Sequence, residues 1–213
     1  MAAYLDHIVI TAPALESGIE YVRAVLGVDC SPGGEHERMG THNALLRLSE
    51  TVYLEVIAPN PHAPEPRRHR WFGLGRFNAD TPPRLSAWIA RVSDLDGALN
   101  RCPSLGIAEA MSRAALDWRI SIPADGSLPF EGVAPTLIEW SGNEHPARRL
   151  PDVGASLVRL EGYHPDVHGI ATVLRAIGFA DEFYVHPIAQ DCEPRLVAHV
   201  ATPQGLRVLG AVP

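Results

Sequence analysis

The sequence of 213 residues contains no lysine, and all 18 of its basic residues are arginine. This absence excludes Schiff-base chemistry, a lysine general base and a P-loop, because each of these needs a lysine side chain. Any anionic substrate must therefore be held by arginine, by a metal ion or by the N-terminus of a helix.

Cysteine is scarce as well. Cys30, Cys102 and Cys192 are odd in number and far apart in the sequence. This spacing excludes both a disulfide framework and a CxxC metal site, and it fits reduced thiols in a cytosol.

Long apolar runs and an excess of basic charge are also absent. No stretch approaches the roughly 18 consecutive apolar residues of a membrane span, and the N-terminal residues MAAYLD do not resemble a secretory signal. The formal net charge of −7 provides no basic field for nucleic acid. We therefore expect a cytoplasmic protein that binds neither membranes nor nucleic acids.

What the chain does contain is one order of elements repeated three times, at a period of about 70–80 residues. A strand, a helix and further strands are expected in each of residues 1–59, 85–150 and 151–213. Residues 60–84 hold five prolines and show no sustained apolar period. We interpret that segment as a linker or a lid loop.

Four stretches of this pattern resemble the glyoxalase-like domain of the vicinal oxygen chelate superfamily. They are LDHIVI, GGEHERMGTHNALLRL and YLEVIAP in the first repeat, and LPFEGVAPTLIEWSGNEHPARRL in the second. The resemblance covers most of residues 4–165. It implies an α+β fold in which paired βαβββ modules form an open, cup-shaped mixed sheet, with a third βαβββ-like module appended.

The resemblance also implies a metal site, since the first and last strands of each module hold the metal where this superfamily has one. Carried over to this chain, the ligands are His7 and Glu55 in the first module and Glu139 in the second, while Ala87 stands at the fourth place. One imidazole and two carboxylates suit manganese, iron(II) or magnesium better than structural zinc. The cofactor is therefore expected to be a divalent metal ion (Mn, Fe(II), Mg or Zn), or to be absent.

Each of these residues also has a simpler interpretation. His7 could be a core histidine, Glu55 could pair with Arg47, and Glu139 could be solvated at a strand end. Strand alternation predicts that Asp6 and His7 face opposite sides of the sheet, so Asp6 is not expected to orient His7.

The segment GGEHERMGTHN predicts further site residues. His36, His42 and Asn43 are expected to line the cup, with the histidines and Glu139 as candidates for proton transfer and Asn43 for substrate binding. The alternative is a flexible hairpin in which the glycines adopt positive φ angles.

The segment RRHRWFGLGRF, residues 67–77, combines four arginines with three aromatic residues. It either packs Trp71 and Phe72 on the core, or forms a lid in which Arg70 grips a carboxylate or phosphate. Arg70, Trp71 and Trp118 are accordingly candidates for substrate binding. His145, which precedes a proline, is expected to cap a turn and to lie near Glu139.

Three functions are compatible with these features. The first is a homodimeric, metal-dependent lyase, isomerase or dioxygenase acting on a small, vicinally oxygenated substrate. The second is a metal-free protein of the resistance type that binds a small molecule, favoured by Ala87 and the supply of aromatic residues. The third is a domain whose cup is filled and which acts only through its dimer.

Overall fold

The computed structural model describes residues 2–113, 116–142 and 144–210. Its first module comprises β1 (Tyr4–Thr11), α1 (Leu15–Leu26), β2 (Ser31–His36), β3 (Thr41–Arg47) and β4 (Tyr53–Pro59). The second comprises β5 (Arg84–Arg91), α2 (Leu95–Arg101), β6 (Ile107–Arg113), β7 (Leu116–Ile122), β8 (Thr136–Trp140) and the short α3 (Pro146–Arg149). The third comprises β9 (Ser156–His164), α4 (Val167–Ile177), β10 (Tyr184–Pro187), β11 (Arg195–Thr202) and β12 (Gly205–Leu209).

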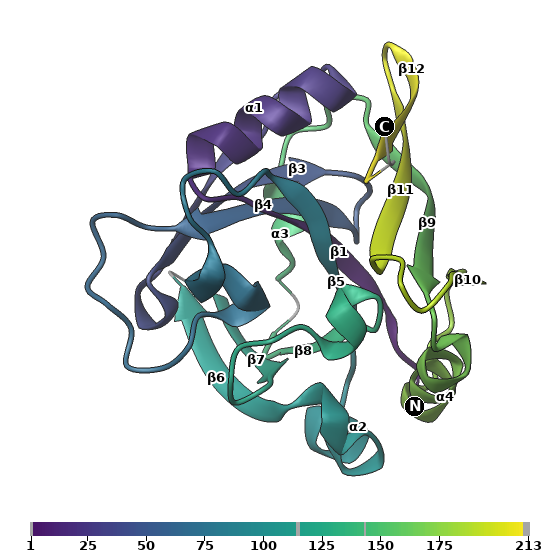
Figure 1. The fold of residues 1–213 in the computed structure, drawn as a ribbon. Coiled ribbons are helices and arrows are strands. Elements are labelled where there is room, and N and C mark those ends of the chain that lie inside the picture. The colour runs from purple at the N-terminus through teal and green to yellow at the C-terminus, as the bar shows by residue number, and fades with distance from the viewer. Residues whose placement is uncertain (1, 114–115, 143, 211–213) are drawn as a thin grey trace.

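The first two modules form one curled sheet of eight strands in the order β2-β3-β4-β1-β5-β8-β7-β6 (Figure 1). In each module the first and last strands are parallel neighbours, and the antiparallel pair β1–β5 joins the modules at the centre. The expected paired βαβββ cup is confirmed. Strand β6, which the sequence pattern did not reveal, completes the second module.

Helix α1 shows why the sequence forms these elements. Val22 and Leu26 lie on its buried face, and Gly27 ends it in the left-handed conformation at φ 70° that glycine adopts without strain. The helix packs on the convex side of the sheet, where it contacts β3 and β4. Alternate strand residues therefore point either to the helices or into the cup.

The third unit keeps the element order of the other two but not their strand pairing. Its sheet has the order β10-β9-β11-β12, with β10 parallel to β9 and β11 antiparallel on the other side of β9. It is a separate sheet that packs on the convex side of the cup near β5 (Figure 1). Leu160, Ile170 and Leu196 of this unit share one apolar cluster with Trp88 and Val133 of the cup.

The segment 60–84 is more than a linker. Its short 3-10 helical stretch Trp71–Arg76 places Trp71, Phe72 and Leu74 among the side chains of the concave core, each at most 5% exposed. Phe72 has a positive φ of 54° and is followed by Gly73 at 67°, which makes a sharp turn into the cup. The cup is therefore partly filled by its own chain. No helix in the described part of the chain is long and apolar enough to cross a membrane.

The shared core predicts how the third unit affects the cup. Ile170→Ala removes a fully buried side chain of α4 and should lower the free energy of unfolding by about 2–5 kcal/mol. All four tryptophans lie outside the third unit, so their fluorescence in a urea titration should shift together with far-UV circular dichroism. Ile107→Ala, at a side chain that is 56% exposed, is the matched control. A tryptophan transition that stays at the wild-type midpoint would show that the third unit unfolds independently.

Candidate functional site

The site begins with an irregularity in β1. Leu5 pairs with Ala90 of β5, and His7 pairs with the adjacent Ile89, so Asp6 is an extra residue in a β-bulge. A bulge breaks the alternation of a strand and redirects its side chains. The expectation that Asp6 and His7 face opposite sides was wrong for this reason, because His7 Nδ1 lies 2.7 Å from Asp6 Oδ1.

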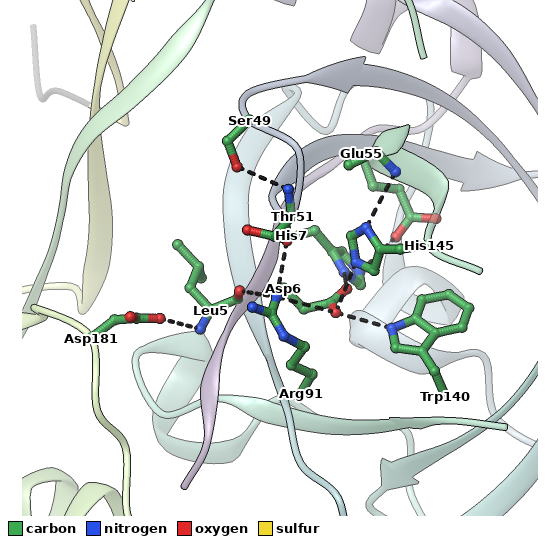
Figure 2. A network of polar contacts seen from close by, with 11 residues as sticks. Leu5, Asp6, His7, Ser49, Thr51, Glu55, Arg91, Trp140, His145 and Asp181 are labelled. Carbon is green, nitrogen blue, oxygen red and sulfur yellow. Dashed lines mark hydrogen bonds and ion pairs between the residues drawn. The ribbon is translucent and has the colours of Figure 1, made fainter. Parts of the chain in front are cut away.

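The bulge also displaces backbone groups, and side chains satisfy them. The Leu5 N–H donates to Asp181 Oδ2 at 2.7 Å, and the Leu5 carbonyl accepts from Arg91 Nη1 at 2.8 Å (Figure 2). These partners come from the third unit and from β5, so distant parts of the chain hold the bulge in place.

Asp6 is fully buried and lies at the centre of a polar network (Figure 2). Besides His7, its carboxylate accepts from Trp140 Nε1 at 3.0 Å and contacts His145 Nε2 at 3.1 Å. Arg91 Nη1 lies 4.0 Å away. His145 Nδ1 accepts from a backbone N–H as the cap of α3, so its Nε2 carries the proton and donates to Asp6.

On its other side His7 faces Glu55 of β4. His7 Nε2 lies 3.6 Å from Glu55 Oε2, and Asn43 Nδ2 donates to Glu55 Oε1 at 2.5 Å. The Tyr53 ring stacks on the imidazole of His7 with 4.3 Å between centroids. His7 and Asn43, rather than Arg47, are therefore the partners of Glu55.

The contacts among Asp6, His7 and Glu55 lower the pKa values of the two carboxyl groups and raise the pKa of the imidazole. Burial raises the pKa of Asp6, but hydrogen bonds from His145 and His7 outweigh it and hold the pKa well below its usual range. Burial lowers the pKa of His7, yet the contacts with Asp6 and Glu55 raise it overall. Burial likewise opposes ionisation of Glu55, and His7 nevertheless holds its pKa at about 2. These shifts favour the ionised forms of Asp6 and Glu55 and the protonated form of His7, so a positive charge on His7 would lie between two negative charges.

Two further residues come from strands at the rim of the cup. His36 ends β2, and burial lowers the pKa of its imidazole to about 4, so the ring is neutral at pH 7. Arg113 ends β6, and its Nη1 donates to Asn43 Oδ1 at 3.0 Å and lies 3.3 Å from His36 Nε2. The permanently charged Arg113 and the carboxylate of Glu55 thus contact the two ends of the same Asn43 side-chain amide.

These residues line two neighbouring spaces. An inner cavity of about 30 Å³ has walls that include His7, Glu55 and Trp140, and it can hold about one or two waters. An outer pocket of about 400 Å³ opens between β2 and β6. His36, Arg113 and Trp118 line both spaces and form the boundary between them.

The structure brings together most of the expected residues. His7, Glu55, His36, Asn43, Trp71 and Trp118 all line the inner cavity. Arg70 does not: it contacts Glu65 and the Gly40 carbonyl and lines a separate surface pocket.

Glu139 and His42 lie on the faces of their strands that point away from the inner cavity. Glu139 sits between Ile138 and Trp140, which face the cup, so it points outward and contacts Arg119 at 3.2 Å. His42 alternates with Asn43 and lines a pocket against α1. Among the described residues neither side chain contacts His7 or Glu55, so the structure does not bring Glu139, expected as metal ligand and proton-transfer group, or His42, expected for proton transfer, together with the other candidate residues.

The pairing register between β5 and β8 explains why Glu139 does not occupy the position equivalent to Glu55. Val9 and Ile89 are each the sixth residue of their strands, β1 and β5. Val9 pairs with Glu55, whereas Ile89 pairs with Thr136. The counterpart of Glu55 in the second module is therefore Thr136.

These positions bear directly on the expected metal. His7 Nε2 and Glu55 Oε2 converge, but the described residues contain no group of three His, Cys, Asp or Glu side chains that could hold a metal ion. Ala87 supplies no donor atom from its side chain. The Asp6 carboxylate contacts the other ring nitrogen of His7, Nδ1, and Arg113 adds a positive charge to the lining of the same cavity. The donor set therefore does not form a cation site on its own.

Sequence reasoning missed Asp6, Arg113 and Tyr53. Asp6 carried a signal, since a charged residue inside a continuous apolar strand must find buried partners. Arg113 carried none, because its strand was not recognised.

Residues 5–178 match the family described as "Glyoxalase-like domain". No curated protein matches the chain. Among solved structures, a hypothetical protein from Staphylococcus aureus is 14% identical with a TM-score of 0.56, over 92% of this chain and 81% of that chain. A methylmalonyl-CoA epimerase in complex with methylmalonyl-CoA and NH4+ is 20% identical with a TM-score of 0.44, over 67% of this chain and 97% of that chain. The first likeness concerns the fold alone, and it extends into the third unit.

The network predicts that Asp6 controls the titration of His7. Asp6→Asn should lower the pKa of the His7 imidazole, because the contact with the Asp6 carboxylate favours the protonated ring. The pKa can be followed by NMR of the ring Cε1–H. Glu139→Gln, on the opposite face of the sheet, should leave it unchanged. An unaltered His7 pKa in the Asp6→Asn protein would contradict the pairing.

Glu55 predicts a pH dependence of stability. Its folded-state pKa of about 2 lies below the ordinary 4.5, so its ionised form stabilises the fold above pH 4.5 and this contribution is lost as pH falls toward 2. Glu55→Gln should therefore lose less unfolding free energy than wild type between about pH 5 and about pH 3, measured by urea denaturation. Glu50→Gln, at an exposed carboxylate, is the control. Equal losses in wild type and Glu55→Gln would contradict the shift.

Proposed function

This chain belongs to the glyoxalase-like domain family, and we propose that it is an enzyme that moves a proton on a small oxygenated molecule. One observation carries the proposal: His7 Nε2 and Glu55 Oε2 lie 3.6 Å apart in the wall of the small inner cavity, with Asp6 behind the imidazole. An imidazolium and a carboxylate at that separation can act as acid and base on neighbouring atoms of one substrate.

In the proposed step, Glu55 removes a proton from a carbon next to a carbonyl group. The electron pair of the broken C–H bond forms the C=C bond of an enol, and His7 Nε2 gives its proton to the carbonyl oxygen. Return of the enol O–H proton to His7, with a proton added to the opposite face of the same carbon, produces an epimer. For a 2-hydroxy carbonyl compound the intermediate is an enediol, and a proton added to the former carbonyl carbon, with loss of the other carbon's hydroxyl proton to His7, produces an isomer. The step needs no oxidant and no other reactant.

The opposed pKa shifts support this assignment, since an acid and a base are best recognised where the environment separates two titratable groups. The imidazolium of His7 keeps the pKa of Glu55 low. Once His7 has given its proton to the substrate, that positive charge is gone and Glu55 becomes a stronger base. The two proton transfers therefore reinforce each other, while Asp6 keeps the ring oriented.

A metal-dependent enzyme is the second candidate, and one observation favours it. Metal-bound histidines usually donate their other ring N–H to a carboxylate, as His7 does to Asp6. His7 and Glu55 could then hold a divalent ion (Mn, Fe(II), Mg or Zn) together with water or substrate, and the ion would supply a Lewis acid.

Proton exchange tests the proposal without knowledge of the natural substrate. In D2O, EDTA-treated protein should exchange the acidic C–H of at least one compound in a panel of small 2-oxo and 2-hydroxy carbonyl compounds, as followed by NMR. Glu55→Gln should slow that exchange by about 10²–10⁴-fold. Glu50→Gln, changed at an exposed carboxylate, should exchange at the wild-type rate.

Other results would identify a different function. Exchange that EDTA abolishes, together with stoichiometric metal that His7→Ala loses, would establish the metal-dependent enzyme. Binding of panel compounds with no exchange would indicate a binding protein instead.

A further inference from the structure

Arg113 is a cation whose partners are all neutral. Its Nη1 contacts the Asn43 amide oxygen at 3.0 Å and the ring of His36 at 3.3 Å. None of the ion pairs formed by the described residues includes Arg113, although it is only partly exposed. A guanidinium has five N–H donors in a planar fork, so most of those of Arg113 remain available at the boundary of the two spaces.

The neutral partners keep the guanidinium in place without cancelling its charge. His36 Nδ1 lies 3.2 Å from Thr41 Oγ1, which leaves Nε2 as the acceptor for Arg113. Asn43 Oδ1 accepts from both Arg113 and the backbone N–H of Gly34. The positive charge is thus positioned but not neutralised.

The pair Gly33-Gly34 provides the space for this arrangement. Neither glycine has a positive φ, so conformational freedom is not their role. A Cβ on Gly33 would lie 2.0 Å from Asn43 Oδ1, and a Cβ on Gly34 would lie 2.9 Å from Arg113 Cδ. The two glycines therefore let β2 approach the side chains of Asn43 and Arg113 closely.

A second unpaired donor lies in the same cavity. Trp71 is 3% exposed, and its Nε1–H is buried with no hydrogen-bond partner among the described residues. Trp71 and Arg113 both line the inner cavity. A buried donor without a partner is costly, and a ligand oxygen would remove that cost.

We propose that the substrate carries a carboxylate, which Arg113 binds at the boundary between the outer pocket and the inner cavity. The proposal deepens the function proposed above and rests on it for the reacting end of the molecule. Asn43 contacts Arg113 at one end of its amide and Glu55 at the other. The Asn43 amide thus links the guanidinium to the base, so a carboxylate on Arg113 would place the rest of a small 2-oxo or 2-hydroxy acid toward Glu55.

The charges around Arg113 favour a monoanion. Glu35 and Glu37 line the outer pocket, and Arg38 in its wall is already paired with Glu109. One free guanidinium matches a carboxylate, whereas a dianionic phosphate would leave excess negative charge beside these groups.

An isosteric series of probes tests the proposal. Pyruvate, pyruvamide and acetylphosphonate are titrated into the full chain and followed by tryptophan fluorescence, since Trp71, Trp118 and Trp140 line the inner cavity. Pyruvate should bind about tenfold more tightly than pyruvamide, because a hydrogen bond to a charged group is worth more than one to a neutral group. Arg113→Met should bring that ratio to about one, and Arg113→Lys should keep part of it.

Gly34→Ala is a second variant that leaves Arg113 in the sequence. Its new Cβ would displace the Arg113 side chain and should weaken pyruvate binding while pyruvamide binding stays unchanged. A wild-type ratio near one, an unchanged ratio in Arg113→Met, or no binding of any probe would overturn the proposal. Tighter binding of acetylphosphonate than of pyruvate would replace the carboxylate by a phosphate-type anion.

The two proposals fail in different ways. Glu55→Gln should lose proton exchange and keep the preference for pyruvate over pyruvamide. Selectivity that depends on Arg113, without exchange on any compound, would refute the enzymatic step alone. Exchange of the panel compounds that Arg113→Met leaves undiminished would refute the role of Arg113 alone.

Discussion

The contact between the Asp6 carboxylate and the His7 imidazole is the interaction on which the site depends. It exists because a bulge in β1 turns two consecutive side chains to the same face. A carboxylate that is fully buried must be compensated by hydrogen bonds or charges, and here Trp140 and His145 supply them from the second half of the cup. The Asp6 carboxylate therefore orients His7 and, through Trp140 and His145, also ties the two modules together.

The polar network lies in a cup that other parts of the chain fill and cover. On the concave side, Trp71 and Phe72 fill the space that an open cup would leave, and on the convex side the third unit covers β5. The remaining inner cavity is about 30 Å³, and the Glu55 side chain in its wall is almost fully buried, so its charge interacts more strongly with its neighbours than it would in water. The outer pocket borders this cavity at His36 and Arg113.

The absence of lysine has a consequence for this site. An ammonium that is buried can lose its proton, whereas a guanidinium keeps its charge at any pH of interest. The cation beside Asn43 is therefore permanent, while the proton on His7 can move. One fixed positive charge and one mobile proton are what the proposed reaction of an anionic substrate through an enol would need.

Apart from β6, the sequence by itself determined the order of strands and helices and the paired modules, and it predicted that His7, His36, Asn43 and Glu55 lie in one cavity. These expectations follow from local periodicity and from a family resemblance. Only the tertiary structure decided the features that depend on pairing between distant strands, which are the faces of Asp6 and Glu139 and the strand neighbours in the third unit. Alternation predicts the face of a side chain only while the register is regular, and a bulge opposite β5 reversed the prediction for Asp6. The register of β8 placed Thr136 where Glu139 was expected. The third unit likewise repeats the element order with different neighbours, because strand pairing is a non-local choice that a linear pattern does not encode.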